Sequence, residues 1–359
     1  MTADHFKFIV CAGGTGGHIL PGLSIYEELK KEKHEVKFVC RKKDLNLIEE
    51  LKQISKNLFF LNGIGLRRSL SLRNILFLYY LAVNLIKTFL LFLRFSPDRV
   101  VCMGGYITFP VLLMSFFFRI PFYLCEQNSH PGLVNKMFGR FSQEVFVNFA
   151  YTRRFFKKVI VAGNPVRDAV QEAVDRTKAF HYFRFREKKP VLLIMGGSQG
   201  SLRLNYSVAG IFHNLQRFNI IWLVGKKNFN EFKKYRNEGI QILPYLEKMN
   251  YAYSIADMAL SRAGAMSITE LAYYGIAALF IPLALATNNH QLINAGILAK
   301  AKAGELLEEK NLYSDILQSR ISHVYQNRSL YRLNIRKFYV KESTGIIVSR
   351  ICRPVRSRA

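Results

Sequence analysis

The sequence predicts an α/β protein of two domains, each built around a parallel sheet with helices on both faces. Short apolar runs alternate with helical segments along most of the 359 residues, and this alternation is typical of parallel sheets. A strand–glycine loop–helix unit begins near residue 7, and the same pattern starts again near residue 190. A chain of this length also suits two domains. We therefore expect two domains that face each other across a cleft.

The first strand leads into a glycine-rich loop. The strand is expected over residues 7–12, the loop 13–17 reads Gly-Gly-Thr-Gly-Gly, and a helix is expected over about 18–31. Glycine lets the backbone approach a ligand closely, and free amides at a helix start attract anions. The loop is predicted to hold a phosphate or diphosphate, with His18 beside it as a neutral imidazole. The alternative is a tight turn with a solvated histidine.

The loop matches neither common nucleotide-binding motif. No Gly-Lys-Ser/Thr follows it, so it is not a Walker A loop. The next expected strand, 35–40, is followed by Arg41, Lys42 and Lys43 instead of the acid that a nicotinamide site uses. The remaining elements of this half are expected as helices at about 44–55 and 107–119, and as strands at 58–61, 98–103, 121–125 and 159–162.

Polar or glycine-rich clusters follow three of the expected strands. They lie at 13–18, 104–106 and 126–132. Ligands of open parallel sheets bind beyond the carboxyl ends of the strands, so these clusters are expected to converge on one site. Tyr106, Asn128 and His130 lie within them, although each could be an ordinary loop residue.

The most apolar segment spans residues 75–95. It is long enough to cross a membrane, but a true span would cut the first α/β domain in two. It could instead be a buried helix, or a helix that presents part of its apolar face to lipid headgroups. Basic residues within and around it favour the lipid-facing alternative: Arg67, Arg68, Arg73, Lys87 and Arg94.

The second half repeats the design of the first. Strand 191–195 is followed by the loop Gly196–Ser201 and a helix from about 203, and further strands are expected at 220–224, 240–244, 258–261 and 279–282. A small-residue loop after the expected strand 258–261 leads into a helix that contains Glu270. This carboxylate could accept hydrogen bonds from both ribose hydroxyls, or it could be a solvated helix acid. The amide-rich run 288–291 suits sugar hydroxyls.

Composition narrows the class of partner. The formal charge of +27 indicates an anionic partner, which could be a nucleic acid, an acidic membrane surface or a phosphorylated substrate. No helix-turn-helix, zinc finger or aromatic RNA-binding strand is evident, so nucleic acid is not expected. The five cysteines are scattered without metal-binding spacing, which favours reduced thiols in the cytosol. No signal peptide is recognisable, so export is not expected.

Taken together and in order, the motifs resemble the MurG family of bacterial N-acetylglucosaminyltransferases, which convert lipid I to lipid II in peptidoglycan synthesis. The resemblance covers nearly the whole chain. It rests on Gly13–His18, Gly104–Tyr106, Glu126–Asn128, Gly163–Arg167, Gly196–Gly200 and Arg262–Glu270.

The resemblance implies a GT-B fold of two Rossmann-like domains and an inverting transfer from UDP-N-acetylglucosamine to lipid I. It implies a peripheral position on the cytoplasmic face of the inner membrane, contact with an anionic lipid surface, and contacts with other cell-wall synthesis proteins. Residues 1–166 would form the acceptor and membrane-facing domain, with a helix at about 341–359 packed back on it. Residues 167–340 would form the UDP-sugar domain. No cofactor is implied, and the chain contains no Asp-x-Asp, in agreement with a metal-independent site.

Site residues carry over by position. His18 would be the candidate base, with Tyr106 and Glu126 as further candidate catalytic residues. The donor contacts would be Thr15, Gly16, Gly17, Asn128, Arg167, Ser198, Leu246, Ala265, Met266, Ser267, Ile268, Thr269, Glu270, His290 and Gln291. Relatives usually carry histidine where this chain has Cys125. Which of Asn289, His290 and Gln291 meets the sugar is left open.

Two enzymatic alternatives share this kind of fold. A UDP-sugar 2-epimerase would need no lipid and no apolar basic surface. A lipid glycosyltransferase that acts on a diacylglycerol would differ in its acceptor. The non-enzymatic alternative is a basic nucleic-acid-binding protein.

Overall fold

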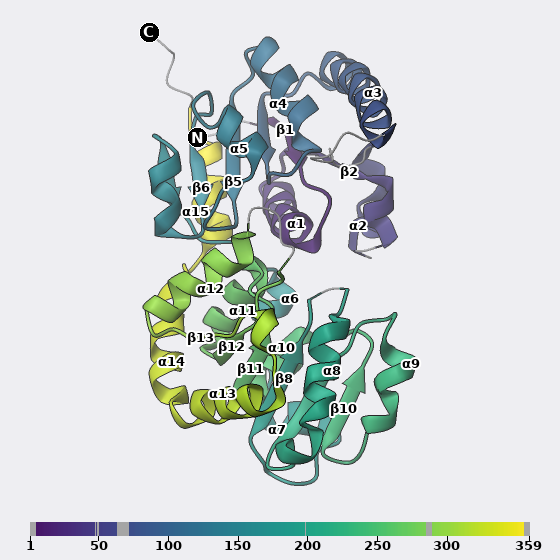
Figure 1. Cartoon of the computed structure of the whole chain (residues 1–359). Helices are drawn as coiled ribbons and strands as arrows, with labels where there is room; N and C mark the ends of the chain where they lie inside the picture. Colours follow the sequence, from purple (N-terminus) through teal and green to yellow (C-terminus); the bar gives the residue numbers. More distant parts are fainter. Residues whose placement is uncertain are drawn as a thin grey trace. The chain divides into compact units, whose positions relative to one another are not determined.

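The computed structural model describes residues 5–46, 48, 50–62, 72–197, 199–284 and 289–354. The chain forms two compact units, one made of Met1–Arg167 with Lys341–Ala359 and the other of Asp168–Val340 (Figure 1). Each unit holds its own parallel sheet, so the two-domain α/β architecture expected from the sequence is confirmed.

The sheet of the first unit has its strands in the order β3-β2-β1-β4-β5-β6-β7, all parallel. The strands are β1 (Lys7–Cys11), β2 (Glu35–Arg41), β3 (Leu58–Leu61), β4 (Arg99–Cys102), β5 (Phe122–Glu126), β6 (Val145–Val147) and β7 (Val159–Val161). The helices are α1 (Gly16–Lys31), α2 (Glu50–Gln53), α3 (Leu72–Phe95), α4 (Thr108–Phe117), α5 (Leu133–Phe138) and α15 (Ser343–Ile351).

Both faces of this sheet are buried, as expected for a parallel sheet with helices on each side. Side chains alternate along β1 because successive residues of a strand point to opposite faces. Phe8 and Val10 join a cluster that includes Ile347 of α15, whereas Ile9 and Cys11 join a cluster that includes Phe92 of α3. Helix α15 packs on α1, so the chain end returns to the first unit.

The second unit has the strand order β10-β9-β8-β11-β12-β13, again all parallel. Its strands are β8 (Val191–Met195), β9 (Asn219–Leu223), β10 (Ile240–Leu243), β11 (Met258–Ser261), β12 (Ala277–Phe280) and β13 (Glu305–Leu306). Its helices are α6 (Asp168–Gln171), α7 (Arg176–Tyr182), α8 (Leu202–Gly210), α9 (Phe229–Phe232), α10 (Met249–Ile255), α11 (Ala265–Tyr274), α12 (His290–Lys300), α13 (Ser314–Gln326) and α14 (Arg328–Ile335).

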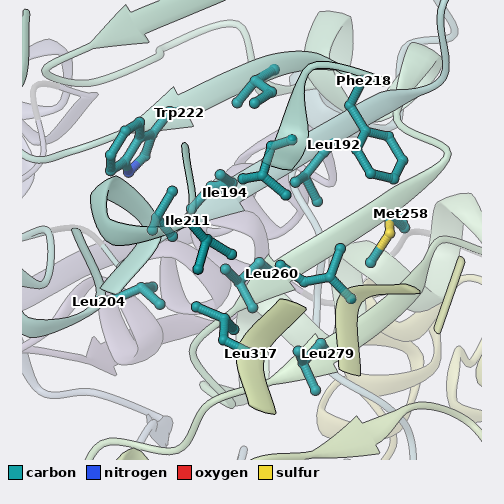
Figure 2. Packing of buried hydrophobic residues seen from close by; sticks show 14 of the residues in the cluster. Leu192, Ile194, Leu204, Ile211, Phe218, Trp222, Met258, Leu260, Leu279 and Leu317 are labelled. Atoms are coloured by element: carbon teal, nitrogen blue, oxygen red, sulfur yellow. The ribbon is translucent and has the colours of Figure 1, made fainter. Parts of the chain in front are cut away.

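Figure 2 shows the core on one face of the second sheet. Trp222 of β9 and Leu260 of β11 are fully buried there, together with Leu204 of α8 and Leu317 of α13. The Trp222 indole nitrogen donates to the Asn205 side-chain oxygen at 3.0 Å, which satisfies its polar atom inside the apolar cluster. This packing fixes α8 against the sheet.

One expected element is wrong. The sequence predicted a single helix at about 44–55, but the structure has a 3₁₀ turn at Lys42–Asn46 and the short helix α2. The reason lies in Asp44, whose buried carboxylate accepts hydrogen bonds from backbone amides outside the segment. The short strands β6 and β13 were not predicted.

Helix α3 is the segment with the strongest membrane signal. Among the described residues it is the helix long and apolar enough to cross a bilayer, with a mean hydropathy of 2.0 over its apolar window. It nevertheless joins β3 to β4, two strands of the same parallel sheet. Its last turns bury Leu91, Phe92 and Phe95 in the core. Helix α3 is therefore a crossover helix of the α/β unit, which argues against a span.

Candidate functional site

Each glycine-rich loop follows an inner strand of its sheet, β1 in the first unit and β8 in the second. In the first unit β1 pairs with both β2 and β4, and in the second β8 pairs with both β9 and β11. The chain therefore winds in opposite directions on the two sides of each central strand. Such a switch point leaves a crevice at the carboxyl ends of the strands, where open α/β sheets bind ligands.

The loop after β1 forms an open helix start. Gly14 has a φ of 98°, a conformation that side chains other than glycine rarely adopt. Thr15 is the N-cap residue, and its side chain makes no capping hydrogen bond. The Thr15 side chain therefore leaves the first amides of α1 uncapped, as an anion site at a helix start requires. Gly16 and Gly17 are the first two residues of this helix.

Asp44 fixes this loop through hydrogen bonds to its carboxylate. Its Oδ2 accepts hydrogen bonds from the Gly14 amide at 3.2 Å and the Arg41 amide at 2.9 Å. Its Oδ1 accepts from Arg41 Nε at 3.0 Å and Nη2 at 2.5 Å. The carboxylate is fully buried, so these four donors compensate its lost hydration.

The same network reaches the loop after β4. Arg41 Nη1 donates to the Tyr106 hydroxyl at 3.1 Å. Gly105 has a φ of 82°, and a Cβ atom placed on it would be in ordinary contact with the His18 ring, at 3.7 Å, so the two loops lie next to each other. His18 Nδ1 is 3.2 Å from Thr15 Oγ1. The structure therefore brings Thr15, His18 and Tyr106 to one edge of the first sheet.

Glu126 is buried beneath the loop that follows β5. Its carboxylate accepts hydrogen bonds from the Gly132 amide at 3.0 Å, the Asn128 amide at 3.1 Å and Asn135 Nδ2 at 2.9 Å. Burial raises the pKa of Glu126, and these donors oppose the rise. The contacts indicate that Glu126 shapes the loop that presents Asn128, whereas its expected catalytic role stays a prediction.

Arg167 is paired in the structure. Its guanidinium forms an ion pair with Glu50, and both side chains are largely covered. The ion pair with Glu50 therefore holds the Arg167 guanidinium in place before any ligand binds. A diphosphate would have to share it with, or take it from, the Glu50 carboxylate.

The loop after β8 repeats the glycine design in the second unit. Gly197 and Gly200 have φ values of 87° and 73°. A Cβ atom on Gly200 would lie 2.2 Å from the Val224 carbonyl oxygen, so the turn requires glycine there. Ser198, an expected donor contact, lies outside the described residues.

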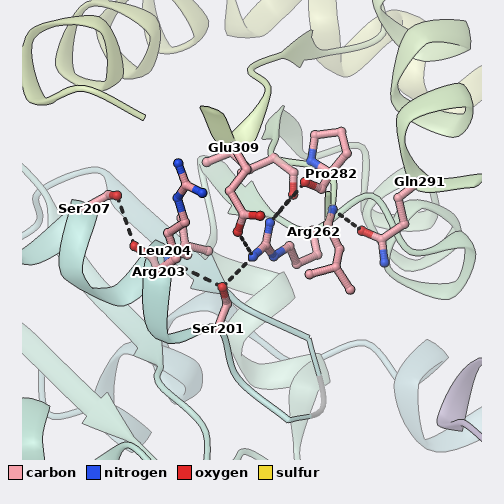
Figure 3. A network of polar contacts seen from close by, with 10 residues as sticks. Ser201, Arg203, Leu204, Ser207, Arg262, Pro282, Gln291 and Glu309 are labelled. Carbon is pink, nitrogen blue, oxygen red and sulfur yellow. Dashed lines mark hydrogen bonds and ion pairs between the residues drawn. The ribbon is translucent and has the colours of Figure 1, made fainter. Parts of the chain in front are cut away.

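A buried ion pair supports this loop (Figure 3). Arg262 Nη2 donates to Ser201 Oγ at 2.5 Å and pairs with Glu309, while Nη1 donates to the carbonyls of Ile281 and Pro282 at 3.1 Å each. Ser201 is the N-cap residue of α8, and its Oγ accepts from the Leu204 amide at 3.4 Å. Arg262 thus ties the loops after β8, β11 and β12 together.

The start of α11 carries the largest group of expected donor contacts. Glu270 accepts a hydrogen bond from the Tyr253 hydroxyl at 2.6 Å. Ile268 and Thr269 are buried, and Thr269 Oγ1 donates to the Ala265 carbonyl at 2.9 Å. Their side chains therefore serve the helix, whereas the backbone amides, the partly exposed Ser267 and Glu270 are able to bind a ligand. Met266 and Ser267 belong to the same first turn.

Three further expected contacts come from other segments of the second unit. Gln291 Oε1 accepts from the Leu283 amide at 3.0 Å (Figure 3). His290 is the first residue of α12, and its N-cap Asn289 has a φ of 52°. Leu246 is buried after β10, with 5% of its surface exposed.

Sequence reasoning missed the supporting residues Asp44, Tyr253 and Glu309, none of which belongs to a recognisable motif. It named Ser201 only as the end of the glycine loop, without its contact to Arg262. Arg41 was noted for its charge, but its contact with Asp44 depends on a turn that the sequence did not predict.

The chain is similar to known glycosyltransferases over most of its length. Residues 8–147 match the glycosyltransferase family 28 N-terminal domain, and residues 191–346 match the glycosyltransferase family 28 C-terminal domain. The calicheamicin glycosyltransferase CalG4, at 13% identity and a TM-score of 0.72 over 98% of both chains, shares the fold. The crystal structure of MurG from Acinetobacter baumannii has a TM-score of 0.76 and 25% identity, covering 96% of this chain and 99% of that one. The GT-B expectation is confirmed.

Two curated relatives carry the name UDP-N-acetylglucosamine–N-acetylmuramyl-(pentapeptide) pyrophosphoryl-undecaprenol N-acetylglucosamine transferase. The protein from Flavobacterium psychrophilum is 33% identical over 365 residues, which cover 99% of each chain. The protein from Aquifex aeolicus is 32% identical over 342 residues, covering 92% of this chain and 96% of the other. With both catalytic domains matched and near-complete coverage, this chain belongs to the MurG family of N-acetylglucosamine transferases.

Proposed function

We propose that this chain transfers N-acetylglucosamine from UDP-N-acetylglucosamine to the muramyl 4-hydroxyl of lipid I and so produces lipid II for peptidoglycan. The observation that carries this function is the 33% identity, over 99% of both chains, with a protein named for this transfer. The relatives favour this transfer over the 2-epimerase alternative. They equally favour it over a nucleic-acid-binding role.

The second unit is proposed to bind the donor. Its switch point presents the amino-terminal ends of α8 and α11, whose amides suit the diphosphate. Glu270 is oriented by Tyr253, and each carboxylate oxygen can accept more than one hydrogen bond, so ribose hydroxyls can be added. His290 and Gln291 at the start of α12 are proposed to meet the sugar.

The first unit is proposed to bind the acceptor and to supply the base. Inversion needs one in-line attack, so a single base must take the proton of the attacking hydroxyl. His18 is our candidate, because it lies at the start of α1 between Thr15 and the loop of Gly105. Tyr106, held by Arg41, would orient the acceptor.

Charge that builds up on the leaving UDP also needs stabilisation. Fixed backbone amides and a guanidinium can provide it without reorganisation. Thr15, Gly16 and Gly17 offer the amides at the first switch point, and Arg167 offers the guanidinium. Asn128, on the loop organised by Glu126, would add an amide side chain.

We further propose that the first unit lies on the cytoplasmic face of the inner membrane through an apolar surface of α3 and α4. Ile86 and Leu93 of α3 are 62% and 53% exposed, and Phe117 of α4 is 67% exposed. Phe118 packs against Phe89 and Phe92, with ring centroids 5.7 Å apart in each case, so the two helices share this surface.

Basic residues and a pocket border this apolar surface. Arg94 and Arg119 are exposed beside it. A pocket of about 460 Å³ lies between α4 and α5 and is lined by Leu113, Phe116, Lys136, Met137, Phe138, Arg140 and Phe141. Exposed apolar area next to cations is what binding to an anionic leaflet requires. Arg67, Arg68 and the side chain of Arg73 lie outside the described residues.

The transfer is tested with radiolabelled UDP-N-acetylglucosamine and a short-chain lipid I analogue. We expect a labelled disaccharide lipid, and no change of the donor when the acceptor is omitted. Transfer to diacylglycerol but not to the lipid I analogue would contradict the proposal, as would epimerisation of the donor alone.

Membrane binding is tested by flotation with vesicles of neutral lipid or with added anionic lipid. Ile86→Asp and Phe117→Asp should each reduce binding to anionic vesicles. The matched control is Leu333→Asp, which changes a residue of similar exposure, 63%, in the second unit. Equal loss in all three variants, or none, would contradict the assignment of this surface.

A further inference from the structure

We propose that Glu32, His34 and Cys352 form a binding site for zinc or a similar borderline divalent cation. The three side chains supply a carboxylate, an imidazole and a thiol, the ligand types that zinc takes in proteins. They lie in the first unit, away from the strand ends that carry the glycine loops. No residue of this group belongs to the proposed donor or acceptor site.

The distances between the ligand atoms fit a tetrahedral ion. Cys352 Sγ is 3.3 Å from His34 Nε2 and 3.9 Å from Glu32 Oε2, and the last two atoms are 3.5 Å apart. Bond lengths of about 2.3 Å to sulfur and about 2.1 Å to nitrogen and oxygen give tetrahedral edges of about 3.6, 3.6 and 3.4 Å. The three atoms therefore already form one face of a zinc tetrahedron.

The backbone positions Glu32 and His34 before any ion binds. Helix α1 ends in a Schellman motif, in which the His34 amide donates to Leu29 O and the Lys33 amide donates to Lys30 O, both at 3.0 Å. Lys33 has a φ of 66°, the left-handed conformation that this motif needs. Glu32 and His34 thus flank a fixed turn and project toward the same sulfur.

Exposure leaves a route for the ion and a position for a fourth ligand. The His34 side chain is 4% exposed, whereas that of Glu32 is 45% exposed. Water can therefore complete the tetrahedron from the Glu32 side. The ring of His5 is close to this turn, with its centroid 6.5 Å from that of His34 and its Nδ1 3.2 Å from the Lys33 carbonyl oxygen.

The two ligands that can be anionic, Glu32 and Cys352, suit a divalent cation. Burial, followed by the Glu32 charge, raises the pKa of Cys352 to about 12, so the ion has to displace the thiol proton when it binds. A bound divalent ion deprotonates a coordinating thiol, and the thiolate and carboxylate then balance its charge. Coordination through Nε2 requires a proton on Nδ1 and displaces the 3.3 Å hydrogen bond from the Phe6 amide.

Such an ion would fasten the returning chain end. Cys352 directly follows α15, while Glu32 and His34 lie between α1 and β2, 320 and 318 residues away. Helix α15 already packs on α1. The ion would add a crosslink at the end of α1 opposite to the glycine loop.

The experiment uses the full chain, stripped with a chelator and titrated with zinc or cobalt alone. We expect one zinc per chain and a thiolate-to-cobalt charge-transfer absorption in the near ultraviolet. The melting temperature should rise by about 5–10 °C at a free zinc concentration of about 100 times Kd. Cys352→Ser should abolish the absorption and weaken binding at least about 100-fold.

Glu32→Gln and Glu28→Gln form a matched pair on one helix turn. Glu28 pairs with Lys31 at 3.1 Å and is not part of the site. Glu32→Gln should weaken zinc binding, whereas Glu28→Gln should leave it unchanged. Binding weaker than ~10 μM in the unmodified chain would overturn the proposal. Unchanged affinity and cobalt spectrum in Cys352→Ser would also overturn it.

Discussion

The Asp44 carboxylate and the Gly14 amide are joined by a 3.2 Å hydrogen bond that fixes the glycine loop to the turn after β2. Asp44 also holds Arg41, which in turn contacts Tyr106. One buried side chain therefore supports both the glycine loop after β1 and the loop after β4. Support of this kind is what a preorganised site needs.

Replacing Asp44 should test this support. Asp44→Ala leaves the Arg41 guanidinium and two amides without their acceptor, so we expect a loss of about 3–5 kcal/mol in unfolding free energy. Transfer activity should fall as well, because the loop loses its anchor. Denaturant unfolding and the transfer assay measure the two effects. The control Asp98→Asn changes an exposed acid that accepts from the Lys7 amide, and its cost should stay near 1 kcal/mol.

His18 should decide the rate of the chemical step if it is the base. His18→Ala is expected to lower kcat by about 10²–10⁴-fold with the fold intact. Thr15→Val removes the neighbouring hydroxyl, 3.2 Å from Nδ1, and should have a smaller effect on kcat. Steady-state kinetics with circular dichroism separates rate from folding. Near-normal turnover of His18→Ala would remove it from the role of base.

Glu270 and Tyr253 should control donor binding. Glu270→Gln weakens a charge-assisted bond to the ribose, so the donor KM should rise about 10–100-fold. Tyr253→Phe should raise it about 2–10-fold, because the carboxylate is less well oriented. Tyr206→Phe removes a similar contact to Glu231 on the surface and serves as the control. An unchanged donor KM in Glu270→Gln would refute the ribose contact.

Alanine substitutions at Gly200 and Gly197 distinguish the free-energy cost of a steric clash from that of an unfavourable backbone conformation. Both have positive φ. Among the described residues, a Cβ on Gly197 meets no atom within 4 Å, whereas one on Gly200 lies 2.2 Å from the Val224 oxygen. Gly197→Ala should cost about 1–2 kcal/mol from backbone strain alone. Gly200→Ala should cost about 3 kcal/mol or more, since overpacking is added. Equal unfolding free energies for the two variants would show that the loop rearranges.

His34 should make the first unit sensitive to acid. Burial lowers the pKa of His34 from 6.5, and the nearby Glu32 opposes this. Below pH 6.5 the unfolded chain therefore binds a proton that the folded chain does not, so stability falls as the pH falls toward the folded pKa. His34→Asn keeps an acceptor near the Phe6 amide but does not titrate. Its unfolding free energy, measured in a metal-free buffer from pH 7 to 5, should change less than that of the unmodified chain.

The sheets and their glycine loops were predictable because their signals are local. The strand Val191–Met195 is a continuous apolar run, and the loop after it repeats the one after β1. Helix Leu72–Phe95 was equally recognisable from its apolar length. Neither inference needed knowledge of distant residues.

The supporting contacts were not predictable, because they join segments far apart in the chain. Glu309 meets Arg262 across 47 residues, and Asp44 meets Gly14 across 30. Acidic residues usually lie on the surface, so the sequence does not indicate that Glu309 and Asp44 are buried. Their burial next to these partners is what makes them supports of the loops. The broken helix after β2 follows from the same cause.

Periodicity and short motifs were enough to predict two parallel-sheet domains, the family and the glycine loops that follow β1 and β8, since hydrophobic alternation and glycine positions act over a few residues. The tertiary structure determines which polar groups support those loops, which helix faces stay exposed, and that Cys352 lies next to Glu32 and His34. These outcomes depend on burial and on distances between remote segments, which no local pattern encodes.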